Sequence, residues 1–369
     1  KTNADYTIKI KLGSLITKKN KPINFSINVN DNSIYTQKFW FSDIYRYVNN
    51  SVVMSFGDVG ILAAPGEGCS LVNFTSPTPA NGSSQTETSV EINVSVIEAN
   101  LSSLIYNWNG TNYTIYNDSL VLMYNFDEYT GLNDTSKYGN NCSCTNCPTY
   151  SPLGKYNAAY EFDGVNDYIQ TSNIATSNQE NWTLSVWAKK NSVPTGTEIA
   201  SIILLNGNDD SNGYSIGVKT TDEITILYST IAWKDSSYIM PNNTWTHIVA
   251  TNDNGNLYLY INGILEQNLG SGSTPNKPTT GVTIGTQLNG PGPRYFNGSI
   301  DEVRIWNRSL NSDEIYQQYV SNLNKYNSTQ WYLYVNQSKN STNGLNYGDY
   351  TYQTFTTDTD ENLNSTEER

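Results

Sequence analysis

Few residues in this chain could carry out nucleophilic or redox catalysis. The 369 residues include one histidine, His247, and neither a Gly-x-Ser-x-Gly sequence nor a phosphate-binding loop, so a nucleophilic triad or a dinucleotide site lacks its parts. Two facing carboxylates could hydrolyse a glycosidic bond, and the nearest candidates are the pairs Asp209–Asp210 and Asp222–Glu223. Such pairs on polar loops more often stay solvated or bind Ca²⁺, so we do not expect an enzyme.

Aromatic and amide side chains in two predicted loops could instead recognise sugars. Aromatic rings stack on sugar faces, and side-chain amides bond sugar hydroxyls. The segments 206–214 and 287–295 contain both residue types. The predicted glycan-binding residues are Asp210, Asn212, Trp233, Asn289 and Tyr295. Packing in the core or at its rim is the alternative role for Trp233 and Tyr295.

The chain contains nineteen Asn-x-Ser/Thr sequons, about twice the number that its composition would give by chance. They favour a heavily N-glycosylated, exported protein over the alternative of an Asn-rich composition alone. The predicted sites include Asn93, Asn100, Asn109, Asn112, Asn117, Asn133, Asn181, Asn297, Asn307, Asn327, Asn336 and Asn340.

Four cysteines indicate disulfide bonds in an oxidising environment. Cys144 and Cys147 have zinc half-site spacing, but no second pair follows at the spacing of a zinc ribbon. One possible pairing joins Cys144 to Cys147 and Cys69 to Cys142. The sequence does not choose among the three connectivities.

Charge and hydropathy limit the partners of the chain. No signal peptide, lipidation motif or long apolar stretch is present, so we expect no membrane span in this mature or truncated chain. A net charge of −13 argues against nucleic acid as a ligand.

The first 21 residues differ in charge from the rest. They carry six lysines and one aspartate, which gives +6 − 1 = +5. One interpretation is a solvated edge strand, whose lysines discourage pairing with the wrong strand. The alternative is an assembly strand that docks onto an acidic face of another copy and builds a homopolymer. Its alternating apolar residues are Tyr6, Ile8, Ile10 and Leu12.

The composition is typical of an all-β protein with two or three domains. Tyrosine outnumbers phenylalanine 28 to 9, charged residues make up only 15%, and Asn-Gly turn sequences recur along the chain.

Two motifs are the most informative for the fold. Residues 298–310 read GSIDEVRIWNRSL, where Asp301, Glu302 and Arg304 interrupt an apolar, half-buried inner strand. A short helix is predicted directly after it, with Ser312 as the capping residue. Residues 161–169 read EFDGVNDYI, in which Asp-Gly and Asn-Asp indicate a hairpin turn between two strands.

With the predicted strands at 181–188, 243–250 and 255–263, these motifs resemble a laminin-G-like, concanavalin-type domain over residues 119–322. The resemblance implies a jelly-roll β-sandwich that serves as a lectin, adhesion module or enzyme accessory domain. It also implies a Ca²⁺ site with Asp134 and Asp301, and with Asp127 as a weaker candidate. The alternative is that Asp301 caps or pairs with a neighbouring strand.

The flanks supply strands for a second sandwich. Alternating apolar residues at 90–96 and a hairpin about Asn109–Gly110 precede the laminin-G-like region. Leu345, Gly348 and Tyr350 resemble the tyrosine corner of immunoglobulin-like and fibronectin-III-like domains. We therefore interpret residues 76–118 and 323–369 as one Ig-like domain that carries the insertion, and residues 1–75 as a small β region. Two separate strand units are the alternative.

This arrangement resembles multi-domain surface proteins of prokaryotes, archaea included. We expect an extracellular, N-glycosylated, non-enzymatic surface or filament subunit that binds copies of itself or surface glycans. The alternative is a carbohydrate-binding module of a secreted glycosidase.

Overall fold

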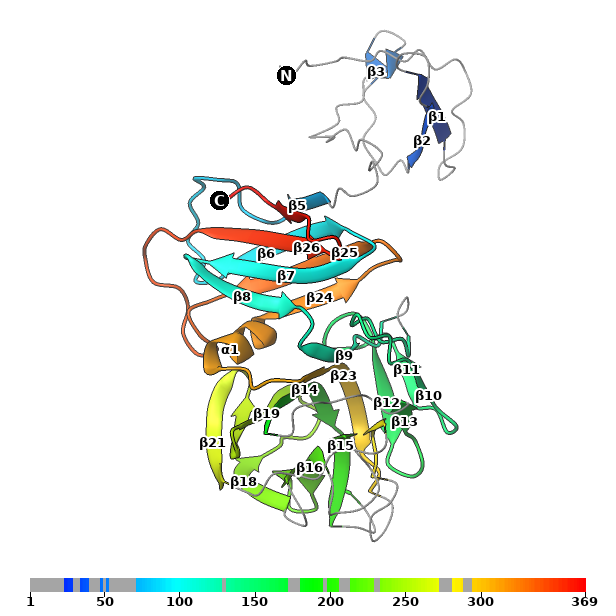
Figure 1. Cartoon of the computed structure of the whole chain (residues 1–369), viewed down its shortest axis with the longest axis vertical. Coiled ribbons are helices and arrows are strands. Elements are labelled where there is room, and N and C mark those ends of the chain that lie inside the picture. Colours follow the sequence, from blue (N-terminus) through cyan, green and yellow to red (C-terminus); the bar gives the residue numbers. More distant parts are fainter. Residues whose placement is uncertain are drawn as a thin grey trace. The chain divides into compact units, whose positions relative to one another are not determined.

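The structure is a computed structural model in which two compact units form the chain, Lys1–Ala64 and Pro65–Arg369 (Figure 1). It describes residues 71–127, 131–171, 180–194, 198–205, 213–228, 233–271, 281–287 and 294–369, together with the backbone of four short strands before residue 53. Among these residues, no helix combines the length and the apolar character that crossing a membrane requires.

The first unit contains two antiparallel strand pairs. β1 (Ile23–Asn28) pairs with β2 (Ile34–Phe39), and β3 (Tyr47–Val48) pairs with β4 (Ser51–Val52). The predicted assembly strand with Tyr6, Ile8, Ile10 and Leu12 lies outside the described residues and stays a prediction.

The larger sandwich of the second unit has a seven-stranded sheet on one side. Each strand is antiparallel to its neighbour. In order across the sheet, the strands are β10 (Cys142–Ser143), β13 (Ile169–Thr171), β22 (Val282–Ile284), β15 (Ile199–Leu205), β16 (Tyr214–Lys219), β17 (Glu223–Tyr228) and β18 (Trp233–Ile239).

An eight-stranded antiparallel sheet forms the other side. Its order is β11 (Thr149–Ser151), β12 (Ala159–Asp163), β23 (Asn297–Trp306), β14 (Asn181–Lys190), β19 (Thr246–Asp253), β20 (Asn256–Ile261) and β21 (Ile264–Ser271), and β9 (Leu120–Tyr124) also pairs with β23. Both sheets contribute to one buried apolar core that includes Phe162, Trp182 and Ile226. The predicted all-β sandwich class is confirmed.

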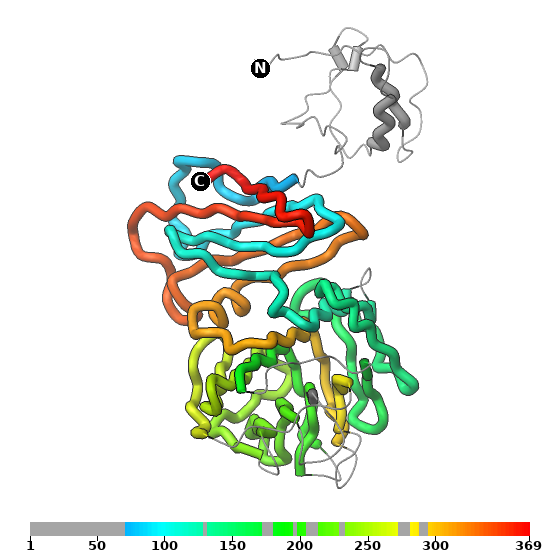
Figure 2. Tube along the Cα trace, in the orientation of Figure 1, coloured from blue at the N-terminus to red at the C-terminus, as the bar shows by residue number. Residues whose placement is uncertain are grey.

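The smaller sandwich combines strands from both ends of the second unit, as the neighbouring cyan and orange-red segments show in Figure 2. One sheet has the order β24 (Ser321–Lys325), β25 (Gln330–Gln337), β6 (Val90–Ile97) and β5 (Leu71–Thr75). The other has the order β27 (Leu363–Ser365), β26 (Tyr352–Asp358), β7 (Leu101–Trp108) and β8 (Thr111–Tyr116). Because β5 pairs with β6, this sandwich begins before the predicted boundary at residue 76.

Two local features of the smaller sandwich match their sequence patterns. β7 and β8 form the predicted hairpin, whose turn residues Asn109 and Gly110 have φ of 50° and 83°, a conformation that asparagine and glycine adopt readily. The hydroxyl of Tyr350 donates to the carbonyl oxygen of Asn346 at 3.0 Å, which is the geometry of a tyrosine corner.

The helix α1 (Ser312–Val320) follows β23 as predicted, but its capping residue is Asn311 instead of Ser312. The Asn311 side chain accepts from the backbone of Asp313 and Glu314, and Glu314 accepts from the Asn311 backbone. Asparagine and serine cap helices about equally well, and the glutamate three positions later selects Asn311 as the capping-box residue.

The prediction of a hairpin within residues 161–169 is wrong. β12 before the turn pairs with β11 and β23 in the eight-stranded sheet, whereas β13 after it pairs with β10 and β22 in the seven-stranded sheet. The turn residues, with Gly164 at φ of 77°, therefore carry the chain from one sheet to the other. Asp-Gly sequences permit both kinds of turn.

Candidate functional site

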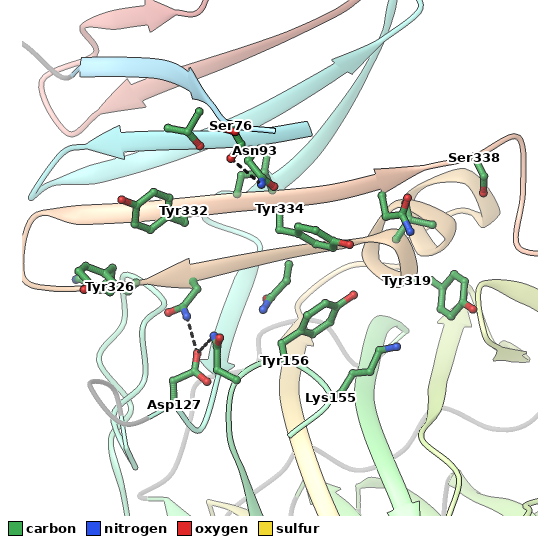
Figure 3. A pocket seen from close by; sticks show the side chains of 18 of the residues that line it. Ser76, Asn93, Asp127, Lys155, Tyr156, Tyr319, Tyr326, Tyr332, Tyr334 and Ser338 are labelled. Carbon is green, nitrogen blue, oxygen red and sulfur yellow. Dashed lines mark hydrogen bonds between the residues drawn. The ribbon is translucent and has the colours of Figure 1, made fainter. Parts of the chain in front are cut away.

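A groove lies between the exposed face of the β24–β25–β6–β5 sheet and the 155–157 loop of the larger sandwich (Figure 3). Its volume is about 1240 Å³. The tyrosines that line it are Tyr156, Tyr319, Tyr326, Tyr332 and Tyr334, and the amides are Asn93, Asn157, Asn322, Asn324 and Asn336. Two lysines, Lys155 and Lys325, and one carboxylate, Asp127, contribute charge.

Alternation along β25 builds the sheet wall of this groove. Trp331, Leu333 and Val335 are buried in the core of the smaller sandwich, whereas Tyr332 and Tyr334 between them are only partly buried. Successive side chains of a strand point to opposite faces, so the two tyrosines share the groove face with Asn336.

Neighbouring strands place polar side chains beside these tyrosines. Tyr334 lies opposite Asn322 of β24 and Asn93 of β6. Tyr332 lies opposite Asn324 of β24, and its ring centroid is 5.7 Å from that of Tyr326. The wall therefore consists of aromatic rings bordered by amides.

The opposite wall is a loop that the buried carboxylate of Asp301 fixes in place. Its Oδ2 accepts hydrogen bonds from the backbone N–H groups of Lys155 at 2.9 Å and Tyr156 at 3.1 Å. The Tyr156 ring then stands 6.1 Å from the Tyr334 ring across the groove, in an edge-to-face arrangement. Asp301 thus positions an aromatic residue opposite the tyrosine row.

Asp127 bridges the two walls at another point of the groove. Its Oδ2 accepts from Asn324 Nδ2 at 2.6 Å and from Asn157 Nδ2 at 3.3 Å, and Oδ1 accepts from the backbone of Ala158. Burial raises the pKa of the Asp127 carboxyl, and these hydrogen bonds oppose the shift. The carboxylate therefore connects both sandwiches.

Lys155 is a half-buried cation in the groove. Its Nζ lies 4.2 Å from the ring centroid of Trp187 and 5.6 Å from that of Tyr156. Burial lowers the pKa of the Lys155 ammonium, and Asp301 opposes the shift. Within the described residues Lys155 forms no salt bridge, so the aromatic faces and the charge of Asp301 stabilise the ammonium.

A buried polar network lies behind the 155–157 loop. Glu302 accepts from Arg304 Nη2 at 2.8 Å and from Asn125 Nδ2 at 3.0 Å, and Arg304 also donates to Gln318 and Asn322. Burial raises the pKa of Glu302 to about 7, although Arg304 opposes the shift. Glu302 occupies a register shift between β23 and β14 with φ of 51°, the irregularity of a β-bulge.

The expectation of a half-buried β23 is therefore wrong. Asp301, Glu302 and Arg304 are all buried, because β23 lies inside its sheet and its polar side chains bond to the 155–157 loop, α1 and β24. The sequence marked these residues as polar but could not show which distant segments would bury them.

The carboxylates predicted to bind Ca²⁺ accept hydrogen bonds from the chain itself. Asp134 accepts from the backbone of Met123, Ser136 and Asn140, and Asp301 accepts from the Lys155 and Tyr156 backbone. Burial raises the pKa of both carboxyls. Among the residues that the structure describes, no three His, Cys, Asp or Glu side chains gather at one point. The calcium site stays a prediction.

Of the predicted glycan-binding residues, the structure describes Trp233 and Tyr295. Trp233 starts β18, and the guanidinium of Arg294 lies 5.3 Å from its ring centroid; Trp233 and Tyr295 are partly buried and do not line the groove. Asp210, Asn212 and Asn289 lie outside the described residues.

Neither His247 nor Asp222 lines the groove. His247 is buried and shares a 2.9 Å hydrogen bond with Ser185 Oγ, and burial lowers the pKa of its imidazole to about 3. Asp222 pairs with the buried ammonium of Lys190.

The described sequon asparagines are all accessible at least in part. Seventeen of the nineteen lie in the described residues, and none of these is buried. They include the predicted sites Asn93, Asn100, Asn109, Asn112, Asn117, Asn133, Asn181, Asn297, Asn307, Asn327, Asn336 and Asn340.

Cys144 and Cys147 form a disulfide bond. Cys142 forms no disulfide bond with another described residue, and its thiol donates to the carbonyl oxygen of Leu132 at 3.0 Å. Because Cys69 lies outside the described residues, a Cys69–Cys142 bond stays a prediction.

Sequence reasoning missed the groove, although part of its signal is visible. Tyr332 and Tyr334 alternate with apolar residues in the segment QWYLYVNQ, and this pattern predicts two tyrosines on an exposed sheet face. What the pattern cannot show is that the 155–157 loop lies opposite that face.

Comparison with known proteins identifies the larger sandwich. Residues 163–316 match the concanavalin A-like lectin/glucanases superfamily, in its laminin-G form. This part of the chain is a laminin-G-like domain. The human adhesion G-protein coupled receptor D1 is 28% identical over 123 residues, and the match covers 31% of this chain and 14% of the receptor. The chain therefore spans only a small part of this curated relative.

Solved structures with a similar fold are more distant in sequence. Domain 4 of AbnA, an extracellular arabinanase of Geobacillus stearothermophilus solved with arabinotriose, is 20% identical with a TM-score of 0.42, over 53% of this chain and 96% of that one. The botulinum neurotoxin serotype D binding domain is 19% identical with a TM-score of 0.45, over 57% of this chain and 55% of that one. At these values neither structure says what this chain binds.

Proposed function

We propose that this chain belongs to an extracellular, N-glycosylated surface protein that adheres to oligosaccharides through the groove between its sandwiches. The single observation that carries the proposal is the row of Tyr332 and Tyr334 facing Tyr156 across a groove bordered by amides. Aromatic faces match the C–H faces of sugars, while amides supply donors and acceptors for their hydroxyls.

The rest of the chain is consistent with display at a cell surface. The exposed sequons support glycosylation, and the Cys144–Cys147 disulfide supports an oxidising compartment. The partial match to an adhesion receptor supports an adhesive role. The smaller sandwich, built from strands on both sides of the laminin-G-like domain, would be the Ig-like frame that holds it.

The test uses unglycosylated protein from a host without N-glycosylation, screened on an oligosaccharide array and then titrated by calorimetry. Tyr334→Ala and Tyr332→Ala should each weaken binding at least tenfold, which is a loss of about 1.4–3 kcal/mol of binding free energy. Tyr347→Ala is the matched control, because the Tyr347 side chain is fully exposed and does not line the groove.

Equal binding by all three variants would place the sugar site elsewhere, for example near Trp233. Absence of binding by the unsubstituted protein to every oligosaccharide on the array would contradict the function itself.

A further inference from the structure

We propose that an N-linked glycan on Asn336 occupies the groove of its own chain. The inference rests on the proposed function, since it takes the groove to be an oligosaccharide site. The glycan that the protein itself carries would then be the first sugar chain to occupy this site.

Asn336 is placed to receive a glycan and to direct it into the groove. The residue begins the sequon Asn336-Gln-Ser338, is exposed and lines the groove. It pairs with Glu91 of β6, and because β24 begins opposite Val335, no residue of β24 pairs with Asn336. Its side-chain amide makes no hydrogen bond to any described residue, so glycosylation would break none.

Asn93, the other sequon asparagine that lines the groove, is less suited to carry such a glycan. Asn93 lies on the inner strand β6, between β25 and β5. Its Nδ2 donates to Ser76 O at 3.4 Å and to Glu91 Oε1 at 3.1 Å, and its Oδ1 is buried. A glycan on Asn93 would have to break these contacts, so Asn336 is the site that the geometry favours.

The modification itself needs only a phosphate-activated oligosaccharide as co-reactant. Nδ2 of Asn336 forms a bond to the anomeric carbon of the first sugar as the bond from that carbon to the donor phosphate breaks. The phosphate leaves with the bonding electrons, and Nδ2 releases one proton. No oxidant or reductant takes part.

From Asn336 the sugar chain would follow the tyrosine row. Same-face residues of a strand are about 7 Å apart, so Tyr334 comes first and Tyr332 next, with Tyr156 on the other wall. The groove volume of 1240 Å³ exceeds the roughly 300–1,000 Å³ of typical small-ligand pockets, which leaves room for several sugar units. Bound in this way, the glycan would contact both sandwiches and compete with foreign oligosaccharides for the groove.

The experiment compares four preparations of the full chain by calorimetry. They are unglycosylated protein, glycosylated protein, glycosylated Asn336→Gln and glycosylated Asn81→Gln. Asn81 is a matched control, because it is an exposed sequon asparagine away from the groove. The titrant is the oligosaccharide released from the glycosylated protein, and peptide mass spectrometry establishes the occupancy of Asn336.

Unglycosylated protein and glycosylated Asn336→Gln should bind the released oligosaccharide at least tenfold more tightly than glycosylated protein and Asn81→Gln. Equal affinity of glycosylated protein and Asn336→Gln would overturn the inference, and so would an unmodified Asn336.

If no preparation binds, the proposed function fails, and a second measurement tests the cis glycan separately. Chemical nitration should then modify Tyr332 and Tyr334 several-fold more slowly in glycosylated protein than in glycosylated Asn336→Gln. Equal nitration rates would show that the glycan does not cover the groove.

Discussion

The side-chain amide of Asn125 donates a hydrogen bond to the carbonyl oxygen of Leu323 at 2.9 Å, across 198 residues of sequence. Asn125 follows β9 of the larger sandwich, and Leu323 lies in β24 of the smaller one. The same Nδ2 donates to both carboxylate oxygens of Glu302. This buried amide thus connects the polar network behind the 155–157 loop to β24, a strand of the sheet that forms one wall of the groove.

Replacing Asn125 with alanine should therefore loosen the contact between the sandwiches. The substitution leaves Leu323 O and part of Glu302 without a donor, which costs about 1–3 kcal/mol for each buried group left unsatisfied. We expect a lower urea midpoint and faster amide hydrogen exchange in β24. Asn81→Ala, at an exposed position, is the control, and an unchanged β24 exchange rate in Asn125→Ala would show that Asn125 does not hold the sandwiches together.

Glu302 should make stability depend on pH. Its folded-state pKa of about 7 exceeds the ordinary value of 4.5, so its favourable contribution is present below pH 4.5 and is lost as the pH rises through 7. Relative to Glu302→Gln, the free energy of unfolding of the wild type should fall by roughly 2–3 kcal/mol between pH 4.5 and 8.

The matched comparison with Glu302→Gln is necessary because other groups titrate nearby. The raised pKa of Asp301 acts in the same direction, whereas the lowered pKa of His247 costs stability as the pH falls below 6.5. His247 remains in both proteins, whereas the charge of Glu302 itself contributes to the raised pKa of Asp301, so the difference between the two stability curves reports these two carboxyls together. Parallel curves would mean that Glu302 stays ionised in the folded protein.

Local patterns predicted much of the fold because their causes are local. The alternation in β6 and the Asn109–Gly110 turn depend on neighbouring residues, and each is present in the structure. The hairpin predicted at 161–169 failed for a non-local reason. Whether β13 pairs in the sheet of β12 depends on β22 and β23, which lie more than a hundred residues away.

The site was less predictable than the fold, for the same reason. A Tyr-x-Tyr segment identifies an exposed aromatic face, but its opposite wall comes from residues 155–157, which β23 positions through Asp301. The carboxylate of Asp301 was expected to bind a metal from the resemblance alone. Its observed partners are backbone N–H groups, and no sequence spacing reveals them.

Chelation of Ca²⁺ should leave the melting temperature unchanged. In the structure, two backbone N–H groups point at Oδ2 of Asp301, and Asp134 accepts from three others. A cation bound to these carboxylates would have to displace donors that then lack partners. Differential scanning calorimetry with excess EDTA and with millimolar Ca²⁺ tests this. A rise in melting temperature with Ca²⁺, abolished by Asp134→Asn, would instead establish the predicted calcium site.

Lys190 and Asp222 connect the two sheets of the laminin-G-like domain. Lys190 ends β14 of the eight-stranded sheet, and its side chain is fully buried. Asp222 lies in the turn between β16 and β17 of the seven-stranded sheet, and its side chain is about one-third exposed. Burial lowers the pKa of the Lys190 ammonium, so the pair neutralises a charge that would otherwise be costly in the core.

The two partners should respond unequally to substitution, because only one of them is buried. Asp222→Asn keeps a residue that tolerates the φ of 71° at this position, but it leaves the buried ammonium without its counter-charge, which costs about 3–5 kcal/mol. Lys190→Met removes the buried charge, keeps most of the side-chain volume and leaves Asp222 partly hydrated. We expect a loss of under about 1.5 kcal/mol for this substitution. The double variant should recover most of the stability lost in Asp222→Asn, as measured by urea unfolding. If Asp222→Asn costs no more than Lys190→Met, water or another group must already stabilise the ammonium, and the ion pair does not stabilise the contact between the sheets.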